Sequence, residues 1–167
     1  ELKLVDEILA ALGITELSFR NLGELSGGQQ QLVSIAQTLV PAIADWCRID
    51  LLDEGGQQHR RISYHRDAER ARRALEMAQQ LQVAPQIEGS MAWCIARREP
   101  YYGRFDAPPA SEHAALRQFH ETFGMHAYYV VPLIARGRTL GGLRVMQAES
   151  GRDLTPEDRA LVMELGR

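Results

Sequence analysis

The sequence predicts an α+β fold, in which an antiparallel sheet of about five to six strands carries helices on both faces and follows an N-terminal helical segment. Two pairs of strand-like segments, 46–52 with 58–65 and 126–135 with 139–147, are each joined by a turn and therefore predict hairpins. Helical patterns lie before, between and after these pairs. Hairpins at both ends of the sheet favour this α+β sandwich over a doubly wound fold.

The first forty residues predict two helices. Residues 2–12 place apolar side chains at helical spacing, and Gly13 follows where a left-handed C-cap would lie. Ser26 stands three residues before Gln29 in a capping-box arrangement, which predicts a longer helix over about 27–40. Proline at position 41 cannot donate a backbone hydrogen bond, so it is expected to kink or restart that helix.

The middle of the chain alternates between strand and helix patterns. Apolar and charged residues alternate over 46–52, and turn residues separate this strand from the next one at 58–65. Asp67 is placed to act as the N-cap of a helix over 68–82. The apolar run 90–96 is interpreted as a third strand.

The last third of the chain begins with a predicted loop over 100–109, which is rich in aromatic residues and prolines. Ser111 then caps a predicted helix that ends at Gly124. The final hairpin turns at 136–138, and residues 155–156 supply a threonine N-cap and a proline at the first position of the last helix.

Composition and charge exclude several classes of protein. The chain has 167 residues, of which 45% are hydrophobic and 25% charged, as is usual for one folded domain. A net charge of −3 argues against nonspecific nucleic-acid binding, and the arginines over 60–73 are interleaved with acidic residues, as on a solvated helix face. No apolar run could span a bilayer and no signal peptide is visible, so we expect no membrane partner and a cytoplasmic location.

The segment 25–29, with its flanks 21–24 and 30–36, resembles the signature motif of ABC-transporter ATPases. Glycines and a serine at a helix N-terminus allow backbone N–H groups to approach a phosphate. The competing interpretation is that this segment only caps the helix that follows. The residues concerned are Ser26, Gly27, Gly28 and Gln29.

A second stretch, 51–54, similarly resembles the strand and acidic pair of those ATPases, although Gly55 and Gly56 follow it in place of the family's proline and threonine. Nucleotide hydrolysis also needs a loop of the form Gly-x-x-x-x-Gly-Lys-Ser/Thr. The single lysine of the chain is Lys3, and it lies in no such loop. The sequence therefore excludes self-sufficient ATPase activity.

Three further stretches, 39–52, 129–143 and 149–158, resemble the GAF domains of bacterial signalling proteins in order and spacing. The resemblance extends over about residues 32–167. It implies a sandwich, similar to that of PAS domains, with a ligand pocket on one face of the sheet and the terminal helices on the other. The ABC-like and GAF-like patterns overlap between about 32 and 40, and a chimera would account for both.

These resemblances imply two segments, an ABC-like N-terminal helical segment at 1–24 and a GAF-like sensory domain at 25–167. The implied function is a non-catalytic sensory or regulatory domain of bacterial signal transduction. Such a domain would bind a small molecule, form a homodimer through its terminal helices, or do both. The alternatives are a nucleotide-binding fragment derived from an ABC ATPase and an engineered chimera without biological activity.

Aromatic side chains are the candidates for lining a ligand pocket, because small-molecule sites are mostly apolar with a few polar groups. For some of them, including Trp93 and Phe119, core packing is the competing interpretation. No Ser/His/Asp or Cys/His set and no metal-ligand spacing stands out, so no catalytic residue, metal or cofactor is predicted. The candidates are Trp93, Tyr101, Tyr102, Phe105, Phe119 and Tyr129.

Overall fold

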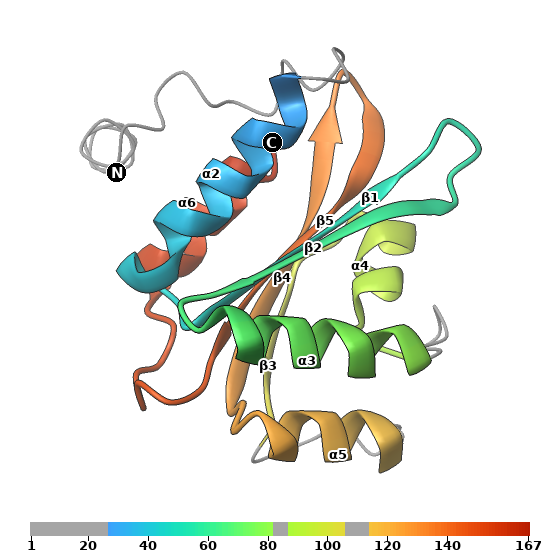
Figure 1. Cartoon of the computed structure of the whole chain (residues 1–167). Coiled ribbons are helices and arrows are strands. Elements are labelled where there is room, and N and C mark those ends of the chain that lie inside the picture. The colour runs from blue at the N-terminus through green and yellow to red at the C-terminus, as the bar shows by residue number, and fades with distance from the viewer. Residues whose placement is uncertain (1–26, 82–86, 106–113) are drawn as a thin grey trace.

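A computed structural model describes residues 27–81, 87–105 and 114–167 of the chain. Its centre is a five-stranded antiparallel sheet with the strand order β2-β1-β5-β4-β3 (Figure 1). The predicted antiparallel sheet is confirmed. The strands are β1 (Trp46–Leu52), β2 (Gln58–His65), β3 (Tyr101–Arg104), β4 (Ala127–Ala135) and β5 (Arg138–Gln147).

Both predicted hairpins are present. β1 pairs with β2, and β4 pairs with β5 through a turn at Arg136 and Gly137, whose φ angles are 50° and 76°. Two consecutive residues with positive φ are typical of the tight turns that suit the twist of a hairpin. β1 also pairs with β5, so strands from the two hairpins lie next to each other at the centre of the sheet.

Helices α2 (Gly27–Ala42) and α6 (Pro156–Leu165) cover one face of the sheet (Figure 1). Their apolar residues share a core with alternate residues of β1, β4 and β5. Pro41 lies inside α2, and the preceding Val40 leaves helical geometry with φ −103° and ψ 112°, which confirms the predicted kink. Thr155 and Asp158 form a capping box at the start of α6, as the threonine–proline pair predicted.

Helices α3 (Ala68–Gln80), α4 (Met91–Arg97) and α5 (Ala114–Thr122) cover the opposite face, so helices lie on both faces as predicted (Figure 1). The side chain of Asp67 accepts hydrogen bonds from the backbone N–H groups of Glu69 and Arg70, which confirms it as the N-cap of α3. A second core lies between these helices and the sheet.

The prediction of a strand over 90–96 was wrong, because these residues begin helix α4. The hydroxyl of Ser90 accepts a hydrogen bond from the backbone N–H of Trp93 at 3.0 Å, and the buried residues Met91 and Cys94 are spaced as on a helix. An apolar run this short has no decisive period. The remaining strand is instead β3, in the stretch predicted as a loop, where it pairs with β4 at the edge of the sheet.

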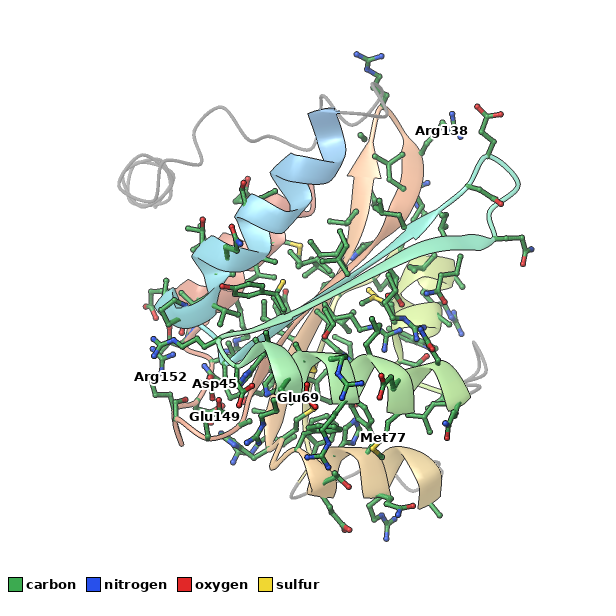
Figure 2. The ribbon with its side chains drawn as sticks, in the orientation of Figure 1. Asp45, Glu69, Met77, Arg138, Glu149 and Arg152 are labelled. Atoms are coloured by element: carbon green, nitrogen blue, oxygen red, sulfur yellow. The ribbon has the colours of Figure 1, made fainter. Side chains whose placement is uncertain are left out.

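Asp45 joins the start of β1 to the loop after β5. Its carboxylate accepts hydrogen bonds from the backbone N–H of Ala148 at 2.7 Å and from the N–H and hydroxyl of Ser150 at 3.1 and 2.7 Å. Asp45, Glu149 and Arg152 lie together at this corner of the molecule (Figure 2). Burial acts to raise the pKa of Asp45, but the hydrogen bonds outweigh burial and hold the pKa below its usual value.

We expect Asp45→Asn to lower the free energy of unfolding at pH 7 by about 2 kcal/mol, since it removes charge-assisted hydrogen bonds. A carboxyl whose pKa is depressed in the folded state stabilises it above the unfolded pKa, and this stability is lost as the pH falls through the folded pKa. The difference between wild type and variant should therefore shrink below about pH 4. Urea unfolding at pH 7 and pH 3 measures this difference in the free energy of unfolding, and Glu54→Gln, at an exposed position, is the control. A difference that does not depend on pH would contradict the explanation.

Candidate functional site

A small cavity lies between the sheet and helices α3 and α5. Its volume is about 20 Å³, which is room for about one water molecule. Side chains alternate along a strand, so Trp46 and Arg48 of β1 face this cavity while Cys47 and Ile49 belong to the core under α2 and α6. The lining residues are Trp46, Arg48, Arg61, Ser63, Ala74, Leu75, Ala78, Phe119, Met125, Arg144 and Met146.

Two of the lining arginines share one buried carboxylate. The side chain of Asp50 is 5% exposed, and its Oδ1 accepts hydrogen bonds from Nε of Arg48 at 3.0 Å and from Nε of Arg61 at 3.1 Å. Arg48 also contacts Oδ2 of the same carboxylate through Nη2. Asp50 lies directly opposite Arg61 in the pairing of β1 with β2, which explains why the three groups meet. One negative charge therefore faces two positive charges.

Arg144 is the third lining arginine and lies opposite Arg48 in the pairing of β1 with β5. The residue is only 6% exposed. Its Nη2 donates a hydrogen bond to the carbonyl oxygen of Gly89 at 2.8 Å, and its guanidinium carbon lies 4.3 Å from the centroid of the Tyr128 ring. Its Nε is buried without a hydrogen-bond partner, and no ion pair with Arg144 is formed by the residues that the structure describes. Burial lowers the pKa of this guanidinium.

His120 of α5 is buried near the cavity, with 3% of its surface exposed. Its ring centroid lies 3.5 Å from that of Phe105 and 5.9 Å from that of Phe119. Burial, and to a lesser extent the positive charge of Arg144, lowers the pKa of His120 to about 2. The imidazole is therefore neutral near pH 7 and is poorly matched to general acid–base catalysis.

We expect the free energy of unfolding to fall by about 2 kcal/mol between pH 7 and pH 5 because of the protonation of His120 alone. The unfolded chain protonates this histidine below its ordinary pKa of 6.5, whereas the folded protein does so only near pH 2. Above the pKa of the unfolded chain, the neutral imidazole therefore makes its full contribution to the free energy of unfolding. This contribution is lost progressively as the pH falls. Urea unfolding at pH 7, 6 and 5 should show a smaller loss for His120→Gln; parallel curves for wild type and variant would rule the explanation out.

A larger hollow of about 380 Å³ opens on the surface beside the cavity. Arg61, Leu75 and Ala78 line both spaces and therefore separate them. Arg61 is held across the gap between β2 and α3, because its Nη1 donates to the carbonyl oxygen of Ala78 at 3.2 Å and its Nη2 to the side chain of Gln58 at 3.0 Å. The hollow has the volume of a small-molecule site.

Comparison with protein families gives a match to the GAF domain over residues 29–167, which include all five strands. The chain belongs to the GAF domain family. GAF domains are commonly sensory or regulatory parts of bacterial signalling proteins. The cavity described above lies on the face of this GAF domain that is opposite α2 and α6.

Solved structures share the fold at low sequence identity. The GAF domain of an Acinetobacter phosphoenolpyruvate-protein phosphotransferase aligns with a TM-score of 0.62 and 19% identity, over 98% of this chain and 88% of that chain. The GAF domain of the same kind of protein from Coxiella burnetii gives 0.60 and 19%, over 99% and 87%. An N-acylhomoserine lactone dependent LuxR family transcription factor from Burkholderia cenocepacia gives 0.60 and 15%, over 98% and 89%. Comparison with curated proteins gives no match.

The structure divides the six aromatic residues that were predicted to line a ligand pocket of this GAF domain. Trp93, Tyr101, Phe105 and Phe119 pack in the core on the side of α3, α4 and α5, where Phe119 alone lines the cavity. The other two, Tyr102 and Tyr129, lie on the opposite face of the sheet. The hydroxyl of Tyr102 donates to Asp153 at 2.7 Å, which joins β3 to the loop before α6.

The ABC-like features do not form a phosphate site in the described part of the GAF domain. Ser26 and the predicted helix at 2–12 lie outside the described residues, and residues 27–29 form the first turn of α2. Asp53 instead accepts a hydrogen bond from the backbone N–H of Gln57 at 2.9 Å in the turn between β1 and β2. Neither the family match nor the solved structures support an ABC-derived segment or a chimera.

Sequence reasoning missed the three arginines that line the cavity. Arg61 was assigned to a solvated helix face, but it lies on β2 and faces the cavity. That interpretation holds for Arg72 of α3, which is exposed and pairs with Glu69 and Glu76. A usable signal was present at Arg144, since it lies between the apolar residues of a central strand.

The described ranges 27–81, 87–105 and 114–167 hold neither a membrane-spanning helix nor a metal-binding cluster. Within these ranges, no helix is both long enough and apolar enough to cross a membrane. In the same ranges, no group of three or more His, Cys, Asp or Glu side chains is placed to hold a metal ion.

Proposed function

We propose that this GAF domain is a non-catalytic sensory domain that binds a small molecule between the sheet and helices α3 and α5. The observation that carries the proposal is the charged lining of the cavity, where the partly buried Arg48 and Arg61 and the buried Arg144 meet apolar side chains. Apolar residues of similar volume often stabilise a core as well as or better than buried charges do, so a purely structural core has little use for this arrangement. A mostly apolar site with a few oriented polar groups is the usual form of a ligand pocket.

The lining supports binding rather than catalysis. Guanidinium groups donate hydrogen bonds but do not exchange protons near neutral pH. The nearby His120 is held neutral by burial. Recognition, followed by a change in how the helices pack, is the function that these groups serve best.

A thermal-shift screen tests the proposal. The compounds should include nucleosides, sugars, amino acids, carboxylates, phosphates, haem and bilins, since a ligand that binds only the folded protein stabilises it by about 2.7 kcal/mol at one hundred times its dissociation constant. We expect at least one class to raise the unfolding temperature saturably, with a 1:1 complex in native mass spectrometry. A screen without any response would count against a sensory pocket.

We further propose that the domain forms a homodimer through the outer surfaces of α2 and α6. Support comes from their common position on one face of the sheet, while α3, α4 and α5 cover the other face (Figure 1). Residues Ser34 and Gln37 of α2 are exposed and available to such an interface. Sedimentation equilibrium over a range of concentrations should give a dimer, and a monomer at the highest concentration would contradict the proposal.

A further inference from the structure

The cavity contains more positive charge than the described residues around it neutralise. Of the described side chains that line it, three are arginines and none is acidic. Arginine remains protonated in proteins, so each guanidinium carries a full charge. The buried carboxylate of Asp50 beneath the lining already accepts hydrogen bonds from Arg48 and Arg61. Arg144 itself hydrogen-bonds a carbonyl oxygen and faces an aromatic ring, and the charge of Asp50 acts on it without forming an ion pair within the described residues.

Two hydrogen-bond donors on side chains that line the same cavity are buried without a partner among the residues that the structure describes. They are Nε of Arg144 and Nε1 of Trp46. An unpartnered buried donor costs free energy, and a buried unpaired cation costs more, so both groups favour a bound hydrogen-bond acceptor. Each would gain from an oxygen that accepts hydrogen bonds. Arginine suits oxyanions in particular, because its planar fork matches two oxygens of a carboxylate or phosphate.

The entry route follows from the position of Arg61. Its side chain separates the inner cavity of about 20 Å³ from the outer hollow of about 380 Å³. It is held there by hydrogen bonds to the carbonyl oxygen of Ala78 and the side chain of Gln58 and by its ion pair with Asp50. A rotation of this side chain would join the two spaces and bring a third guanidinium to the ligand.

We infer that the ligand of this domain is a small anion that carries a carboxylate or phosphate group, and that Arg144 binds this group with Arg48, Arg61 and the indole N–H of Trp46. The inference rests on the proposed function and names the chemical class of its ligand. The anion neutralises the excess charge of the cavity and accepts hydrogen bonds from the unpartnered donors. Its remaining part occupies the outer hollow.

The test uses the full chain with two anionic probes, inorganic phosphate and succinate, and the neutral succinamide, all at constant ionic strength maintained with sodium chloride. We expect one of the anions to raise the unfolding temperature saturably and to give a 1:1 isotherm by calorimetry, and succinamide to have no effect. The two anionic arms distinguish a phosphate from a carboxylate ligand. Equal responses to succinate and succinamide, or a separate sodium chloride titration that reproduces the response to the anions, would overturn the inference.

Substitutions of Arg144 test whether the anion binds in the cavity. Arg144→Met keeps the apolar length of the side chain and is expected to weaken anion binding at least about tenfold. It should also raise the unfolding temperature of the ligand-free protein by about 3 °C, because it removes an unpaired buried cation. Arg144→Lys keeps the positive charge but lacks the planar guanidinium, so it should bind the anion with intermediate affinity. It provides a second test if the methionine variant does not fold. The matched control is Arg138→Met, at the exposed end of the same strand (Figure 2), which should bind like wild type.

The outcomes separate the inference from the function on which it depends. If a neutral compound from the thermal-shift screen binds and both anions fail, the domain is a sensor but the inference is wrong. If no compound of any class binds, both fail. Unchanged anion affinity in Arg144→Met would place the anion elsewhere and would also overturn the inference.

Discussion

Replacement of Gly141 by alanine is expected to lower the free energy of unfolding by about 4 kcal/mol. Gly141 has a φ of 156°, and a Cβ atom added there would lie 1.9 Å from the backbone oxygen of Asp50 and 3.0 Å from the Cα of Leu51. Those atoms belong to β1, which pairs with β5 at this position. The clash is with backbone, so it can be relieved only by separating two central strands.

The neighbouring Gly142→Ala is the matched control. A Cβ atom there would lie 2.3 Å from the sulfur of Met91, which is part of a flexible side chain that can rotate away. We expect this variant to lose about 1 kcal/mol. Urea unfolding followed by circular dichroism measures both variants, and equal losses would show that the approach of β1 to β5 is not the cause.

Trp46→Ala is expected to lower the free energy of unfolding by about 4 kcal/mol, because it removes a large buried side chain and leaves a cavity. Trp46 is fully buried, and its ring centroid lies 4.3 Å from that of His65 and 5.4 Å from that of Phe123. The residue therefore joins β1 to β2 and to the segment after α5. Its loss would also enlarge the space beside the arginines.

Trp46→Phe separates the volume of this side chain from its polar group. The indole N–H is buried without a hydrogen-bond partner, so the phenyl ring keeps much of the packing and removes an unsatisfied donor. We expect a loss of about 1 kcal/mol or less. Thermal and urea unfolding of both variants provide the measurement, and a loss in Trp46→Phe as large as in Trp46→Ala would contradict this interpretation.

The parts of the fold that depend on neighbouring residues could be predicted from the sequence. Turn residues specified both hairpins, and the caps Asp67 and Thr155 marked the starts of two helices. The run 90–96 could not be assigned in this way, because its apolar residues suit a strand or a helix equally. The deciding feature lies elsewhere in the chain, at Gly142, where the absence of a side chain allows α4 to approach β5.

The candidate site was less predictable, because it is assembled from strands that are distant in sequence. Arg48, Arg61 and Arg144 come from three strands, and only the order β2-β1-β5 brings them together. Alternation along a single strand shows which residues share a face but not which strands are neighbours. The same alternation separates Tyr101 from Tyr102, which the sequence presents as a pair and the sheet places on opposite sides.

The alternation of charged and apolar residues in β1 also protects the folding of the sheet. If β1 slipped by one residue against its neighbours, Arg48 and Asp50 would enter the dry core beneath α2 and α6. Asp50 would lose its hydrogen bond from Arg61, and moving the remaining ion pair into an apolar core costs several kcal/mol per ion, a large share of the stability of a domain of this size. Misaligned pairings of this strand are therefore too unstable to persist, and the chain has one accessible alignment.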